Sequence, residues 1–252
     1  MTEFYNKNRI RLRPETIKPL QSIDGKQFLK NALYSEILLN FEPVKEVVLN
    51  KLSKELKPSL YYHNLSHTVD VLCSIQILAV SEQVDEEEFA MIIAAALFHD
   101  TGFIWSYHDN EVYACRFAES ELIRFGYTQE QIDRISGLIM ATSMPQRPQN
   151  KLEMILCDAD LDYLGREDFF FTALRLHREW SENSGKKIPF KDWYEKQRDF
   201  MKSHKYFTNS AQSLRNEKKL KNLSQVIELL DLMDHSTNLM LLRSQFIKES
   251  HT

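Results

Sequence analysis

Four side chains that lie far apart in the sequence have the chemistry to bind one divalent metal ion: His67, His99, Asp100 and Asp160. The pair His99–Asp100 directly follows the run FAMIIAAALF (residues 89–98), which contains no polar residue. A segment that is apolar on every side is expected in the interior of a domain, where an imidazole and a carboxylate are costly to bury alone. A bound cation is a common compensation, because it satisfies both groups and holds the carboxylate ionised.

His67 follows His63 by four residues, so one helical turn brings the two rings to the same side of a helix. On a helical wheel His67 borders the apolar face formed by Val71, Leu72, Ile75 and Leu78. The sequence therefore predicts that the His67 ring is directed toward the core. A lone histidine at a core edge is more often structural than a ligand, so the metal interpretation of His67 depends on the other three side chains.

The stretch CDADLDYLG contains three acids, which a helical wheel at about 100° per residue separates. Asp158 and Asp162 share a side with Lys151, and we expect that side to be solvated. Asp160 falls between two leucines and faces the core, where a carboxylate needs a partner. The sequence thus predicts Asp160 as the fourth ligand, and Asp158 as a residue that orients a ligand or as a surface acid.

Two imidazoles and two carboxylates leave positions for water on a first-row divalent ion. This ligand mixture suits Mn, Fe, Zn, Co or Ni, and Mg is less suited because of the histidines. A water on such an ion ionises near neutral pH and can attack phosphorus, while the cation offsets the phosphoryl charge. The predicted function is therefore metal-dependent hydrolysis of a phosphoester by metal-activated water.

The order and spacing of these residues resemble the HD-domain superfamily of metal-dependent phosphohydrolases. The resemblance rests on His67, on the His99–Asp100 pair in ALFHDTG and on Asp160 in DADLDYLG, and it covers roughly residues 30–180. It implies an all-α fold, metal binding by these four residues and cleavage of a phosphoester in a nucleotide or other small phosphate.

The segment YYHNLSHTVDV is similar to the corresponding segment of class I cyclic-nucleotide phosphodiesterases. That similarity implies a catalytic role for His63, as the acid that protonates the leaving oxygen, beside the role of Asp100 at the metal. A capping or packing histidine is the alternative. The chain is shorter than those catalytic domains and lacks their glutamine-plus-aromatic purine clamp near the C-terminus. The substrate is therefore not transferred with the motif, and cyclic-nucleotide hydrolysis is kept as an alternative.

Two further hypotheses concern the metal and its use. His108 in SYHDNE could serve a second ion bridged by Asp100, or it could be an ordinary loop histidine before a helix. The domain could also be a catalytically inactive sensor or interaction module that keeps the metal site. The presence of His63 argues against such an inactive module, because a site without turnover has no chemical need for an acid.

Several basic and aromatic side chains near the motifs are weaker candidates for substrate contact. Any of four basic residues could touch a phosphate, although solvated surface positions are the default expectation for them. Three aromatic residues could line a pocket, with core packing as the default. The basic residues are Arg116, Arg147, Lys151 and Arg166, and the aromatic ones are Trp105, Tyr107 and Tyr163.

Composition narrows the class of protein. The chain has 252 residues and a formal net charge of −4, which gives no support to a nucleic-acid partner. The longest apolar run is too short to span a bilayer, residues 1–10 do not read as a signal peptide, and the three cysteines show no CxxC spacing. We therefore expect a cytoplasmic protein without a membrane partner, acting on a small phosphorylated substrate. A homo-oligomer through the C-terminal stretch IELLDLMDHSTNLMLL is compatible with the sequence.

The elements that must position these residues are predicted to be helices. From Gln27 to the end the apolar period is helical, and no alternating strand run or repeat occurs. We expect an arm over residues 1–25 and a single all-α domain over residues 26–252, a multi-helix HD-domain bundle with additional C-terminal helices. Caps, prolines and glycines predict helices over about 43–56, 64–80, 86–98, 110–125, 128–142, 151–164, 168–184, 189–203 and 210–247.

Overall fold

The structure, a computed structural model, describes residues 36–249, with side chains described from 41 to 235. The predicted arm over residues 1–25 lies outside the described residues. Within the described part the chain forms α-helices and two short 3₁₀ helices and contains no strand, which confirms the all-α fold. The elements are α4 (Glu36–Glu55), α5 (Leu65–Ser81), α6 (Glu86–Phe98), η1 (Thr101–Ile104), α7 (Asn110–Arg124), α8 (Gln129–Ala141), α9 (Lys151–Asp160), η2 (Asp162–Gly165), α10 (Phe169–Asn183), α11 (Phe190–Ser203) and α12 (Asn209–Glu249).

Local capping chemistry explains where the helices near the motifs begin. The Asn64 side chain accepts hydrogen bonds from the backbone amides at the start of α5. Asp85 and Glu88 form a capping box at the start of α6, and Thr128 and Gln131 form another at α8. Each cap satisfies amides that have no partner inside the helix. The helix starts predicted from these residues are confirmed.

Two predicted boundaries are wrong. Pro43 lies inside α4 rather than in its first turn. The predicted helix over 151–164 stops at Asp160 as an α-helix and continues as the 3₁₀ helix η2. At the end of η2 the backbones pack closely, because a Cβ on Gly165 would lie 2.6 Å from the backbone oxygen of Arg215 in α12. Asp160 is therefore found at a helix end rather than inside a longer helix.

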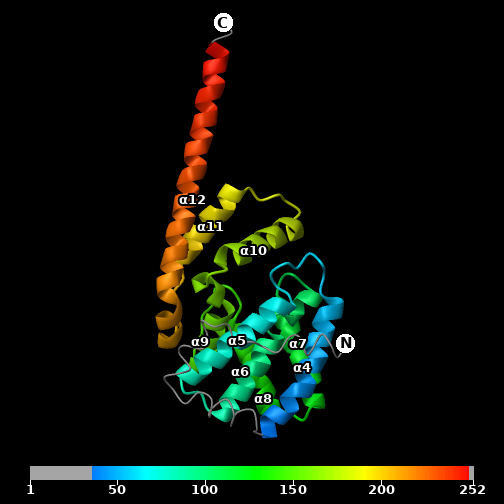
Figure 1. Ribbon diagram of the computed structural model, residues 1–252. Coiled ribbons are helices and arrows are strands. Elements are labelled where there is room, and N and C mark those ends of the chain that lie inside the picture. The colour runs from blue at the N-terminus through cyan, green and yellow to red at the C-terminus, as the bar shows by residue number, and fades with distance from the viewer. Residues whose placement is uncertain (1–35, 250–252) are drawn as a thin grey trace, which may run out of the picture.

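The helix α6 lies at the centre of the first core. All ten residues of its apolar run are buried, as an all-round apolar helix requires. It packs against α4, α5, α8 and α9, which surround it in Figure 1. A charged or polar group at the C-terminal end of α6 therefore lies in the interior.

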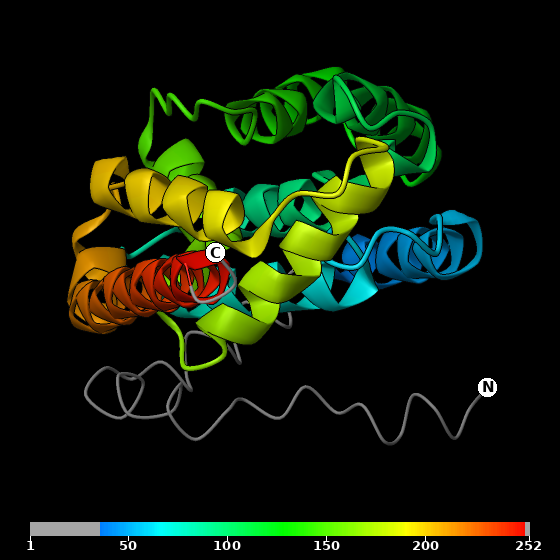
Figure 2. The same ribbon diagram turned by 90° about the horizontal axis from the view of Figure 1, so that it is seen from above.

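A second core lies between α10, α11 and α12 and includes the buried rings of Phe169 and Trp193. In Figures 1 and 2 α11 and α12 stand on the side of the molecule away from α4, and the C-terminal part of α12 extends past α10 and α11. Among the described residues, no helix combines the length and apolar character that crossing a bilayer requires. The single-domain organisation over residues 26–252 stays a prediction.

Candidate metal centre

The four candidate ligands lie at or next to helix ends that meet in the interior. His67 lies in the first turn of α5. His99 caps the C-terminus of α6, and Asp100 directly follows it before η1. Asp160 is the last residue of α9. The structure therefore brings together side chains that are separated by up to 93 positions in the sequence.

Three of these residues form a compact group. The Nε2 atoms of His67 and His99 are 3.3 Å apart. Oδ2 of Asp100 lies 3.3 Å from Nε2 of His67 and 3.2 Å from Nε2 of His99. One ligand atom from each of the three residues lies within 4.8 Å of the others. These atoms are close enough to share one ion.

Asp160 approaches the same pair of imidazoles unevenly. Its Oδ1 lies 3.1 Å from Nε2 of His67 and 3.7 Å from Nε2 of His99. Its other oxygen, Oδ2, accepts a hydrogen bond of 3.1 Å from Nε2 of Gln146. Asp160 thus directs one oxygen to the imidazoles and the other to an amide.

The donor set fits a divalent metal ion. Ligand bonds of roughly 2.0–2.2 Å place neighbouring donor atoms about 3 Å apart, as the two imidazoles and Asp100 are placed here. Oδ2 of Asp100 is buried and has no hydrogen-bond donor, which is an expensive arrangement for a carboxylate unless a cation binds it. Nδ1 of His99 lies 2.7 Å from the Ala96 carbonyl oxygen, so it can donate there and leave Nε2 free to bind a metal.

The protonation of the ion-free site follows from the same geometry. Burial by itself lowers the pKa of His99, but the nearby charges of Asp100 and Asp160 raise it to about 9. Burial raises the pKa of Asp100, yet the charges of His99 and His63 hold it well below its usual range. A proton on His99 is therefore what stabilises the carboxylate without metal, and a metal ion would take the place of that proton.

His63 lies beside the centre and is held by a buried glutamate from α10. Its Nδ1 is hydrogen bonded to Oε1 of Glu179. The other oxygen of Glu179 accepts from the backbone amides of Tyr62 (2.7 Å) and His63 (3.0 Å). The ring stacks on Phe103, with 4.2 Å between the centroids. These contacts fix the ring, and no hydrogen bond among the described residues uses its Nε2.

The charge on His63 is favoured by its surroundings. Burial by itself lowers its pKa, but the charge of Asp100 and the hydrogen bond and charge of Glu179 raise it above its usual value. The hydroxyl of Tyr107 donates to Oε1 of Glu179 at 3.2 Å. Glu179 is fully buried. This one interior carboxylate is therefore hydrogen bonded to three residues from the loops around the site, Tyr62, His63 and Tyr107.

Sequence reasoning missed both Glu179 and Gln146. Glu179 had a usable signal, because it falls on the inner face of α10 with Phe169, Ala173 and Leu176. The argument that selected Asp160, an acid among apolar residues on a wheel, applies to it equally. Gln146 had none, since it lies in the loop between α8 and α9, where no period indicates direction.

The predicted solvated face of α9 is wrong. Asp158 is 1 % exposed, and its oxygens accept hydrogen bonds from the amides of Phe207 and Thr208 and from the Thr208 hydroxyl. Asp162 is also buried and pairs with Arg215 at 2.6 Å. The α12 segment covers this face. Asp158 therefore anchors the start of α12, and its contacts do not include the four candidate ligands.

The other weaker candidates lie away from the ligand group. His108 is exposed in the loop before α7, with its ring 6.1 Å from that of Tyr107, and it is not part of the compact group. Arg166 is buried and pairs with Asp70 (2.9 Å) and Asp168 (2.6 Å), so the expected solvated position is wrong for it. Exposed positions are found for Arg116, Arg147 and Lys151.

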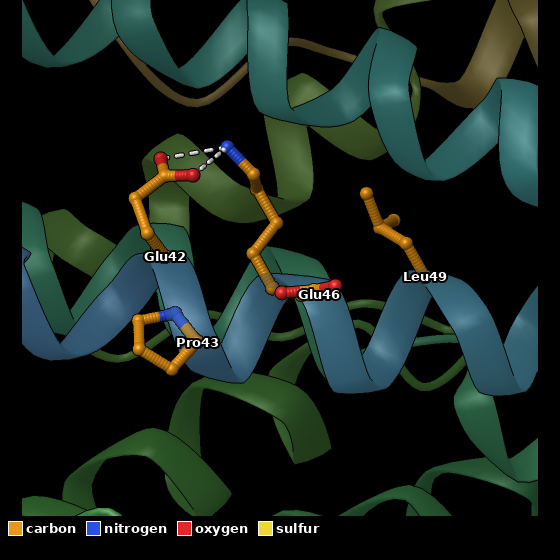
Figure 3. A pocket seen from close by; sticks show the side chains of 5 residues that line it. Glu42, Pro43, Glu46 and Leu49 are labelled. Atoms are coloured by element: carbon orange, nitrogen blue, oxygen red, sulfur yellow. Dashed lines mark hydrogen bonds and ion pairs between the residues drawn. The ribbon is translucent and has the colours of Figure 1, made fainter. Parts of the chain in front are cut away.

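Two surface cavities are distinct from the ligand group. One of about 400 Å³ lies on α4, where Lys45 pairs with Glu42 (Figure 3), and its lining contains none of the predicted ligands. Another, of about 390 Å³, is bordered by the end of α8 and the following loop. The residues lining it are Met140, Ala141, Ser143, Met144, Pro145 and Arg147. Both sequence neighbours of Gln146, Pro145 and Arg147, therefore line this second cavity.

Comparison with known proteins agrees with the geometry. Residues 64–162 match the family model of the HD domain, and this segment contains all four candidate ligands. No curated protein matches the chain. The matched segment runs from the Asn64 cap to η2 and includes α6 with the His99–Asp100 pair. Taken with the all-α architecture, the match supports an HD domain over residues 64–162 of the chain.

Proposed function

We propose that the protein is a metal-dependent phosphohydrolase that cleaves a phosphoester in a nucleotide or another small phosphate. The observation that carries the proposal is the close approach of ligand atoms from His67, His99 and Asp100, which lie within 4.8 Å of one another. Oδ2 of Asp100 is buried there without a hydrogen-bond donor, and Oδ1 of Asp160 lies 3.1 Å from Nε2 of His67. The HD domain belongs to metal-dependent hydrolases, which agrees with this donor set.

The four ligands would hold a first-row divalent ion, with Mn, Fe, Zn, Co and Ni all suited to imidazole and carboxylate. When bound, such an ion supplies an acidified water and offsets the charge that develops on the phosphoryl group. The protein contributes the buried surroundings of His67 and His99, which keep both imidazoles oriented. Binding of the ion displaces the His99 proton, so metal affinity should increase with pH.

His63 is the group that we assign to proton transfer. Glu179 fixes Nδ1 and Phe103 fixes the ring plane, so Nε2 can carry a proton to the leaving oxygen of a substrate held at the metal. Both Glu179 and Asp100 favour the protonated ring. The protonated ring that they favour is the form that a general acid requires.

A cyclic-nucleotide phosphodiesterase is the second candidate. The specific observation in its favour is the YHN-x-x-H segment, in which Nδ1 of His63 is hydrogen bonded to the acid Glu179. The test is turnover of cyclic AMP or cyclic GMP with added Mn²⁺, and loss of that turnover in His63→Ala. Hydrolysis of other phosphoesters without any action on cyclic nucleotides would contradict this candidate.

The general proposal is tested by screening phosphorylated metabolites and a generic phosphodiester against a panel of divalent ions. Asp100→Ala should remove activity and bound metal together, whereas Asp133→Ala, an exposed acid on α8, should change neither. Activity that survives Asp100→Ala would overturn the assignment. Stoichiometric metal without hydrolysis of any compound would instead favour the sensor hypothesis.

Two of the cysteines support the cytoplasmic location that we propose. Cys115 and Cys157 are free thiols, as expected in a reducing compartment.

A further inference from the structure

The carboxylate of Asp160 is divided between two environments. Oδ1 lies 3.1 Å from Nε2 of His67, on the side of the ligand group. Oδ2 accepts a hydrogen bond of 3.1 Å from the amide Nε2 of Gln146. The same Oδ1 lies farther from the second imidazole, at 3.7 Å from Nε2 of His99. The orientation of the Asp160 carboxylate therefore depends on something other than the imidazoles.

The loop that carries Gln146 is tied to the helix that carries Asp160. The Cys157 thiol in α9 donates to the carbonyl oxygen of Ala141, at the end of α8, at 3.2 Å. Gln149 donates to the Arg147 carbonyl oxygen at 2.7 Å. Its own backbone amide donates to Glu153, in the first turn of α9, at 2.5 Å. The loop is therefore held against α9 on both sides of Gln146.

We propose that Gln146 is a positioning residue that makes Asp160 a one-oxygen ligand of the metal; this inference rests on the proposed metal site. The amide occupies Oδ2, so the carboxylate plane is fixed with Oδ1 facing the imidazoles. A neutral donor suits this task, because an arginine or lysine would neutralise the charge that the metal requires. Partners that orient metal ligands in this way typically change metal affinity by about 10–100-fold.

Gln146→Met tests this role, because methionine has nearly the same length but no donor. We expect the affinity for Mn²⁺, measured by titration calorimetry without substrate, to weaken by about tenfold or more. We also expect the visible absorption of the Co²⁺-loaded protein to change, because the coordination by Asp160 is altered. Gln129→Met, at an exposed glutamine in the first turn of α8, is the matched control and should retain the wild-type affinity and spectrum.

A double-mutant cycle separates positioning from a structural effect. In an Asp160→Ala background, Gln146→Met should cause no further loss of Mn²⁺ affinity, since its partner is gone. Equal losses in both backgrounds, or an affinity of Gln146→Met within twofold of wild type, would overturn the proposal. If Gln146→Met alters the circular dichroism of the metal-free protein, Gln146→Ala is measured in the same way with the same expected loss. Metal binding is read without turnover, so the result does not depend on the proposed hydrolase activity.

Discussion

The pairing of His63 with Glu179 is the contact that most clearly gives a single side chain a chemical task. The carboxylate is fully buried, accepts from two backbone amides and the Tyr107 hydroxyl, and is bonded to Nδ1 of His63. An interior carboxylate with this many hydrogen-bond donors is held in place. The consequence is an imidazole that is oriented, favoured in its charged form and adjacent to the candidate metal ligands.

A general acid matters most when the leaving group is a strong base. We expect His63→Ala to reduce kcat/KM by about 100-fold or more for an alkyl phosphoester, and by less than tenfold for a p-nitrophenyl ester, whose leaving group needs no proton. The measurement is the dependence of kcat/KM on leaving-group pKa. His235→Ala, an exposed histidine on α12, serves as the control. Equal losses for both esters would argue against proton donation by His63.

The pH profile provides an independent test of Glu179. His63 must be protonated to act, so kcat/KM should fall as pH rises through its pKa. Glu179 raises that pKa, and Glu179→Gln removes the negative charge, so the alkaline limb should move to lower pH. Glu182→Gln, an exposed acid on the same helix, should leave the profile in place. If the alkaline limb of the kcat/KM profile stays at the same pH in Glu179→Gln, a group other than His63 determines that limb.

Each candidate ligand is placed by the end of a helix, so the site depends on where helices stop and how their ends are held. The turn after Asp100 is tight: a Cβ on Gly102 would lie 1.7 Å from the backbone oxygen of Asn110 in α7. The end of α9 is held by η2 and by the contacts of Asp158 with the segment before α12. Geometry at the metal should therefore respond to changes at these ends.

Gly102→Ala should separate η1 from α7 and disturb Asp100. We expect a loss of stability of about 2 kcal/mol or more, measured by urea unfolding, together with weaker metal binding. Gly137→Ala is the matched variant, since nothing lies within 4 Å of the added Cβ in the exposed middle of α8. There the change should stabilise the protein by about 1 kcal/mol. Equal effects at the two glycines would contradict this account.

Asp158 is expected to contribute to the attachment of α12 rather than to catalysis. Asp158→Ala leaves two buried amides and a hydroxyl without their acceptor, so we expect a loss of about 2–4 kcal/mol. Urea unfolding in the presence of EDTA separates this loss from metal binding. Asp199→Ala, which removes an exposed ion pair, should cost less than about 0.5 kcal/mol. Similar values for both variants would show that these buried contacts add little.

In the molecule as a whole, the centre joins the first core to the second. The candidate ligands come from α5, α6 and the end of α9, around the first core. The hydrogen bond between His63 and Glu179 links the site to α10, which belongs to the second core. An ion at this position would cross-link three helix ends. Because the group would form only in the folded state, metal binding should appear as folding stability.

Saturating metal should therefore raise the melting temperature. At 100 times Kd the stabilisation is about 2.7 kcal/mol, which corresponds to roughly 5–10 °C for a chain of this size. The measurement is thermal unfolding with Mn²⁺ compared with EDTA. Asp100→Ala should show no metal-dependent shift, and a shift equal to that of the wild type would mean that the ion binds elsewhere.

The helical architecture and the four candidate ligands could be predicted from the sequence because their signals are local. The caps at Asn64, Asp85 and Thr128 act on amides two or three residues away. The apolar run of α6 identifies a buried helix without reference to its neighbours. The two residues that follow that run therefore had to lie in the interior.

The surroundings of the ligands could not be predicted, because they depend on contacts between distant segments. A helical wheel of α9 shows one apolar face but cannot show that α12 covers the opposite face. The wheel therefore predicts a solvated side for Asp158 and Asp162, whereas both side chains are buried. Glu179 meets His63 across 116 positions, and Gln146 meets Asp160 from a loop without periodicity. Burial and hydrogen-bond partners are set by the packing of whole helices, and that packing is not encoded in the spacing of any one of them.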